Sequence, residues 1–161
     1  MRPSIARRFL LAAAIAALVI PAGVAVATPP QGLTPTPLGR GTFDERLKVS
    51  ADHFKAKFKE PSDFVVLSLH FAPGGTTGWH SHPGPAMAIV QEGTFTLYNA
   101  SDRKCRPNRY GPGQAFVDRG GGNVHIGRNE TRKPVRVLVT FVIPEGAAPT
   151  IDAPDPGTCH F

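Results

Sequence analysis

The sequence predicts an all-β fold, either a β-sandwich or a β-barrel. Short runs of alternating apolar and polar residues recur along the chain, and turn-forming residues such as Gly, Pro and Asn separate them. Beyond residue 27, no segment keeps a helical apolar period over about ten residues. Many short strands at close spacing are typical of sandwiches and barrels.

Residues 1–27 predict a secretory signal peptide that is not part of this fold. Arginines precede an uncharged apolar run, and small residues at Ala25 and Ala27 predict cleavage after Ala27. The uncharged run is also long enough to cross a bilayer, so an uncleaved membrane anchor is the alternative. With cleavage, we expect a secreted, periplasmic or cell-envelope protein without stable membrane association.

Cleavage would leave 134 residues, enough for one domain with a hydrophobic core and too few for two. It would also remove three arginines, leaving 15 basic and 12 acidic residues, so the net charge falls from +6 to +3. This mild excess does not indicate a nucleic-acid partner. The sequence also lacks a G-x-S-x-G nucleophile motif and a phosphate-binding loop.

Pro-rich segments border the β-rich region on both sides. Residues 28–39 are rich in Pro, Thr and Gly, which predicts an extended linker or arm. Residues 40–145 contain the strand-like runs and are expected to form the single folded domain. Residues 146–161 are again Pro-rich and predict a C-terminal tail that follows the surface until Cys159.

The β-rich region divides into strand-sized segments. Residues 63–71 place Val65, Leu67, Leu69 and Phe71 on one face, which predicts a half-buried strand. The other candidates are bounded by turn residues. They are residues 86–90, 94–98, 114–118, 123–127 and 135–143.

Residues 53–60 alternate apolar side chains with lysine and have two interpretations. The first is an edge strand in which Lys55, Lys57 and Lys59 face water and discourage edge-to-edge pairing. The second is a lysine-lined face that attracts an anionic partner.

Two cysteines, Cys105 and Cys159, predict one disulfide bond. An even number of cysteines in an exported chain favours pairing, and without a C-x-x-C motif they do not form a redox or zinc motif. Two free buried thiols are the alternative.

Three histidines form a candidate metal site. His80 and His82 are two residues apart, so on a strand their imidazoles share one face. His125, in another strand-like segment, can supply a third ligand. Any one histidine is more often a solvated or core residue, but this spacing with Gly-rich turns before each segment favours a metal site.

The segment around His80 resembles the first motif of the cupin superfamily. That motif has a glycine, five residues, His-x-His, three or four residues, a glutamate, six residues and a second glycine. Gly74, His80, His82 and Gly93 fall in register with it, and Ala86 occupies the glutamate position.

The second cupin motif is similar to the segment around His125. Gly122, His125 and Asn129 match, whereas Gly120 stands at the usual proline position. Asn129 is expected to have a structural role, tying down the end of its strand.

The resemblance implies a double-stranded β-helix, or jelly-roll, cupin barrel. It implies that His80, His82 and His125 bind a divalent transition metal inside the barrel: Fe, Mn, Ni or Zn. It also makes a homodimer compatible with the sequence, because cupins are often dimers. Trp79 and Met87 are further candidates, for the lining of a ligand pocket.

Ala86 is the main departure from the family pattern. Without the glutamate, three neutral imidazoles leave the charge of a divalent ion uncompensated, so we expect weaker metal binding and a preference for an anionic oxygen ligand. The leading hypothesis is therefore an exported cupin that acts on a small anionic molecule by dioxygenase-like or isomerase-like chemistry. The alternatives are a non-catalytic ligand- or metal-binding module and a structural cupin whose metal site has decayed.

Overall fold

The computed structural model describes residues 26–161. The predicted signal peptide, residues 1–27, lies outside this range except for Val26 and Ala27. Among the described residues, no helix could span a membrane.

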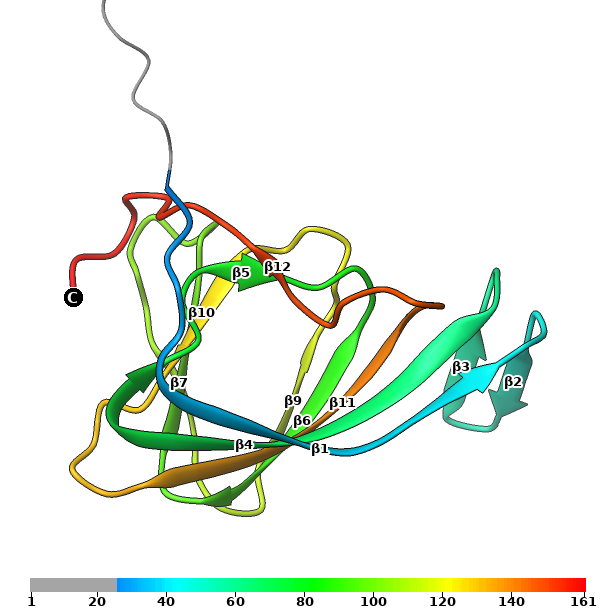
Figure 1. The fold of residues 1–161 in the computed structure, drawn as a ribbon, viewed down its shortest axis with the longest axis horizontal. Coiled ribbons are helices and arrows are strands. Elements are labelled where there is room, and N and C mark those ends of the chain that lie inside the picture. The colour runs from blue at the N-terminus through cyan, green and yellow to red at the C-terminus, as the bar shows by residue number, and fades with distance from the viewer. Residues whose placement is uncertain (1–25) are drawn as a thin grey trace, which may run out of the picture.

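These residues form a nearly closed antiparallel β-barrel, which confirms the all-β jelly-roll prediction (Figure 1). Ten strands form one sheet, in which β12, β5, β10, β4, β11, β6 and β9 follow one another, β1 joins β4, and β7 links β10 to β8. A separate two-stranded sheet pairs β2 with β3. The strands are β1 (Gln31–Phe43), β2 (Lys48–Ala51), β3 (Phe54–Lys57), β4 (Ser62–Thr76), β5 (His80–Ser81), β6 (Ala86–Glu92), β7 (Phe95–Asn99), β8 (Asn108–Tyr110), β9 (Ala115–Asp118), β10 (His125–Arg128), β11 (Val135–Pro144) and β12 (Ile151–Asp152).

The core lies inside the barrel and follows the two-residue period of its strands. On β11 the buried side chains are those at every second position from Val135 to Ile143. On β6 the buried positions are Ala86, Ala88 and Val90. Full burial of each large apolar side chain contributes about 1.5–3 kcal/mol.

Strand β1 occupies the segment that the sequence predicts as a Pro-rich linker or arm. It pairs with β4 from Gln31 opposite Thr76 to Phe43 opposite Ser62, so most of this segment belongs to the barrel sheet. Because proline lacks an N–H donor, it is tolerated in a sheet chiefly on edge strands, and β1 has a partner on one side only. The prolines of this segment are therefore compatible with a strand at the edge of the sheet.

The lysine-rich segment forms β3 of the small hairpin. Lys55 and Lys57 are exposed, as the edge-strand interpretation predicts. Phe58 attaches the hairpin to the barrel by packing on Phe43, with ring centroids 5.5 Å apart.

The C-terminal tail is anchored on the barrel by the predicted disulfide between Cys105 and Cys159. Beyond it, the Phe161 ring contacts Tyr98 and lies under the Arg128 guanidinium, 4.0 Å from the ring centroid. The tail therefore docks on the fold along its length, and β12 within it pairs with β5.

Loss of the disulfide should destabilise the protein strongly. The bond joins residues 54 positions apart, and the chain-entropy estimate for such a loop is about 4 kcal/mol. Cys105→Ser/Cys159→Ser should therefore lower the free energy of unfolding in urea by about that amount. Intact mass before and after reduction, which should differ by two hydrogen atoms, checks that the bond forms. A double variant as stable as the parent protein would contradict the estimate.

Candidate metal centre

Three histidines meet at one end of the barrel interior. His80 begins β5, His82 directly follows it, and His125 begins β10 opposite His80 in the antiparallel pair. All three side chains are buried, and their candidate ligand atoms lie within 4.8 Å of one another. The topology thus brings together the residues that the sequence singled out.

A close turn sets the position of His80. Gly78 has a φ of 68°, and a Cβ there would lie 1.9 Å from the carbonyl oxygen of Thr28. Only glycine fits this left-handed conformation and close approach without a shift of the backbone. The turn lets the chain enter β5 with His80 directed into the barrel.

Each imidazole is oriented by a backbone carbonyl at its Nδ1 atom. The pairs are His80 with Gly78 at 3.0 Å, His82 with Pro149 at 2.7 Å and His125 with Asn123 at 3.0 Å. A carbonyl oxygen only accepts hydrogen bonds, so each neutral ring carries its proton on Nδ1. The Nε2 lone pairs remain available, which is the arrangement that metal-binding histidines need.

Burial also keeps these imidazoles neutral. Desolvation is the largest cause that lowers the pKa of each of the three rings below 6.5, and neighbouring imidazoles lower it further. The carbonyl hydrogen bonds act in the opposite direction without reversing the shift. A neutral imidazole is the form that binds a metal.

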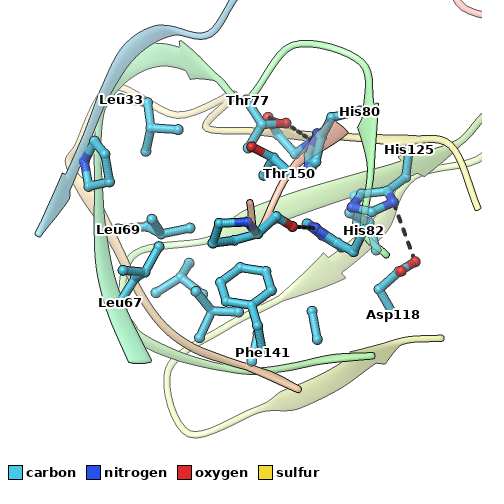
Figure 2. Close-up of a pocket in the computed structure, with 18 of the residues that line it drawn as sticks. Leu33, Leu67, Leu69, Thr77, His80, His82, Asp118, His125, Phe141 and Thr150 are labelled. Carbon is cyan, nitrogen blue, oxygen red and sulfur yellow. Dashed lines mark hydrogen bonds and ion pairs between the residues drawn. The ribbon is translucent and has the colours of Figure 1, made fainter. Parts of the chain in front are cut away.

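A buried carboxylate that the sequence analysis missed lies beside this cluster. Asp118 ends β9, is 4% exposed, and places Oδ2 3.3 Å from Nδ1 of His125 (Figure 2). Its oxygens also accept hydrogen bonds from the Gly120 amide and the Asn123 side chain. The alternation within residues 114–118 offered a signal, because Asp118 shares the inward face with Phe116.

The donor set suits a divalent transition metal. Three imidazole nitrogens leave other coordination positions for water or a ligand, and imidazole binds Zn, Fe and Ni well. A carboxylate that contacts a ligand histidine is a common feature around such metals. The residues present therefore fit the ion that the sequence predicts.

A family model described as "Cupin domain" matches residues 67–141, a range that includes all three histidines. Residues 67–141 therefore form a cupin domain. Comparison with curated proteins finds no match.

Several solved structures are similar to this cupin. A double-stranded β-helix protein of Klebsiella pneumoniae is 23% identical, with 56% of this chain and 74% of that chain covered and a TM-score of 0.46. A cupin domain of Bordetella pertussis is 19% identical, with coverage of 73% and 97% and a TM-score of 0.48. An oxalate oxidase in complex with the substrate analogue glycolate is 25% identical, with coverage of 48% and 41% and a TM-score of 0.43.

The position of Ala86 shows which carboxylate lies near the histidines in the absence of the usual glutamate. Ala86 is buried, lines the cavity beside the histidines and lies directly opposite Asp118 in the β6–β9 pair. Directly opposed residues share a face, with Cβ atoms about 4.5–5.5 Å apart. The centre thus has a carboxylate on the neighbouring strand, which corrects the expectation of a wholly uncompensated metal charge.

Trp79 and Met87, which the sequence suggests for the lining of a ligand pocket, do not line the cavity. Trp79 is 1% exposed and belongs to a separate apolar cluster that packs against the C-terminal tail. Met87 is 41% exposed, because it alternates outward between Ala86 and Ala88. His70, which the sequence analysis did not assign to the site, is exposed on β4.

Asn129 has the structural role that its motif position predicts. Its side-chain nitrogen donates to the carbonyls of Phe71, Ala72 and Lys133. Its side-chain oxygen accepts from the backbone and hydroxyl of Thr131. These bonds close the loop between β10 and β11 and satisfy a fully buried amide.

Removal of the Asp118 charge should weaken metal binding. Asp118→Asn keeps the shape of the side chain but removes the negative charge beside His125, so we expect about a 10- to 100-fold loss of zinc affinity. Isothermal titration with a competing chelator measures it. Asp63→Asn is the matched control, because Asp63 is also buried but bonds to Arg40, Thr42 and the Gly146 amide outside the centre.

A rescue experiment separates charge from structure in this prediction. Ala86→Glu should tighten zinc binding more in the Asp118→Asn background than in the parent protein, where two carboxylates would face each other across β6 and β9. Equal gains in both backgrounds would show that Asp118 does not act through its charge.

Acidification should destabilise the metal-free protein. Because the folded-state pKa values of His80, His82 and His125 are lowered, the unfolded chain binds protons first as the pH falls below 6.5. Above pH 6.5 the imidazoles are neutral in both states and do not oppose folding. As the pH falls from 6.5 towards the folded-state pKa values, the folded protein loses stability relative to the unfolded chain. Thermal melts should shift to lower temperature across this window, and less so in His82→Gln. A His82→Gln profile as steep as that of the parent protein would exclude this cause.

Proposed function

We propose that the protein is an exported metal-binding cupin whose three-histidine centre holds Fe, Mn, Ni or Zn and binds a small anionic molecule. The observation that carries the proposal is that each imidazole bonds to a backbone carbonyl through Nδ1, which leaves its Nε2 atom available to bind a metal. The Cys105–Cys159 bond supports an oxidising, extracytoplasmic compartment.

The bound ion would supply Lewis-acid or oxygen-activating chemistry of a dioxygenase-like or isomerase-like kind. The protein's own residues orient the site. His82 is held by the Pro149 carbonyl, so the C-terminal segment positions a metal ligand. Asp118 holds His125 and places negative charge near the ion.

A non-catalytic binding module is the second candidate. It is favoured by the hydrogen bonds that Asp118 and Thr77, two polar residues of the cavity, make within the protein. Both oxygens of Asp118 accept hydrogen bonds from the protein. The hydroxyl of Thr77 accepts from the Gly127 amide and donates to the Gly78 carbonyl. Both groups are thus already hydrogen-bonded within the protein, which counts against a general base at either position.

Metal analysis of the purified protein tests the proposal. The chain after Ala27, supplied with iron, manganese, nickel and zinc in turn, should retain about one ion per chain. His82→Ala should lose it, because two imidazoles bind an ion much more weakly than three. His70→Ala is the matched control, since His70 is exposed on the outside of β4.

The proposal would be abandoned if the parent protein held well under one ion per chain with every metal. If an ion binds, oxygen uptake with small acids and diketones distinguishes an enzyme from a binding module.

A further inference from the structure

The cavity beside the histidines has two chemically different ends. It has a volume of about 290 Å³, near the lower limit of small-molecule sites. The three histidines and Asp118 lie at one end, and Leu33, Leu67 and Leu69 lie across the cavity from them (Figure 2). A ligand that fills this space must therefore meet both a polar and an apolar surface.

The apolar end is built from inward-facing residues of several strands. Leu67 and Leu69 come from β4, Leu97 from β7, Phe116 from β9 and Val139 from β11. Small residues add room on β6, where Ala86 and Ala88 both line the cavity. This lining matches a hydrocarbon or aromatic group, since each methylene moved there from water contributes favourably.

The charges of the lining limit the ligand to one acidic group. No lysine or arginine is among the described residues that line the cavity. Its two carboxylates, Asp118 and Asp152, lie near the histidines, where Asp152 faces His80 across β5 and β12. A second anionic group away from the metal would thus be buried among leucines without a partner or repelled by aspartate, and both are costly.

We infer that the ligand is an amphiphilic monoanion: one carboxylate or enolate head at the metal and an apolar body in the leucine-lined end. This inference rests on the proposed function, because the ion supplies the partner for the head. It excludes dicarboxylates whose second carboxylate would reach the leucine-lined end, since that charge has no counterpart there.

The cavity opens to solvent along β1 and the C-terminal segment. Pro30, Pro35, Thr150 and Asp152 are lining residues that are also exposed. Asp152 faces His80 across β5 and β12, so the opening on that side leads to the histidine end of the cavity. A ligand can thus enter from solvent and place its anionic head at the histidines.

Straight-chain carboxylates from acetate to octanoate, titrated into the zinc-loaded protein, test the inference. Affinity should rise about fourfold per added methylene until the cavity is full. Octanedioate, which carries a second carboxylate at the far end of the chain, should bind more weakly than octanoate. A series with no dependence on chain length, or octanedioate binding as tightly as octanoate, would overturn the inference.

A pair of variants on β6 tests the location. Ala88→Leu fills part of the apolar end, so affinity should stop rising at a shorter chain than in the parent protein. Ile89→Leu is the matched control, because Ile89 is 47% exposed on the opposite face of the strand and should leave the series unchanged. An unchanged series in Ala88→Leu, with normal thermal melting, would place the chain elsewhere.

The two proposals fail in different ways. If zinc does not bind, the series is measured with whichever of iron, manganese and nickel does. Absence of binding of all four metals overturns the proposed function, and the series is then measured on the metal-free protein. In the metal-free protein, an affinity that rises with chain length supports binding of an apolar body in the leucine-lined end. An affinity that does not rise overturns the inference as well.

Discussion

The hydrogen bonds that the three imidazoles donate to backbone carbonyls are the constraint on which the centre depends. Each fixes a ring, assigns its proton and leaves one nitrogen lone pair for the barrel interior. Gly78 and Asn123 lie two residues from the rings they hold, so local turns suffice for His80 and His125. His82 differs, because its partner Pro149 is 67 residues away. The geometry of the site is therefore as much a property of chain topology as of the His-x-His spacing.

Asp118 shows how the same charge can be provided from another strand. The family pattern places a carboxylate on the strand that follows His-x-His, and here Ala86 occupies that place. The β6–β9 register puts Asp118 directly opposite, where two hydrogen-bond donors hold its oxygens and Nδ1 of His125 lies 3.3 Å from Oδ2. Its negative charge would then act on a bound ion through His125 rather than by direct ligation. The short side chain of Ala86 leaves space in the cavity beside the histidines.

The sequence predicted the barrel, the histidine cluster and the disulfide, because each depends on short-range spacing or on residue type. Alternation identified the inward face of β4, and the spacing of His80 and His82 placed them together. The role of Asp118 follows only from the register between β6 and β9, and the role of Pro149 follows only from the path of the C-terminal tail. Local sequence patterns encode neither of these. β1 was missed because prolines argue against strands except at a sheet edge. Trp79 was misplaced because adjacency to His80 along the chain does not imply a shared face.

The Pro149 contact also sets an order of events in biosynthesis. Pro149 follows His82 by 67 residues, so His82 gains its partner only after the chain between them has been made. The tail is then retained by a disulfide, and disulfides form in oxidising compartments rather than in a reducing cytoplasm. Reduction of this bond would loosen the tail and, with it, the contact that orients His82. The geometry of the histidine cluster is therefore coupled to the redox state of two distant cysteines.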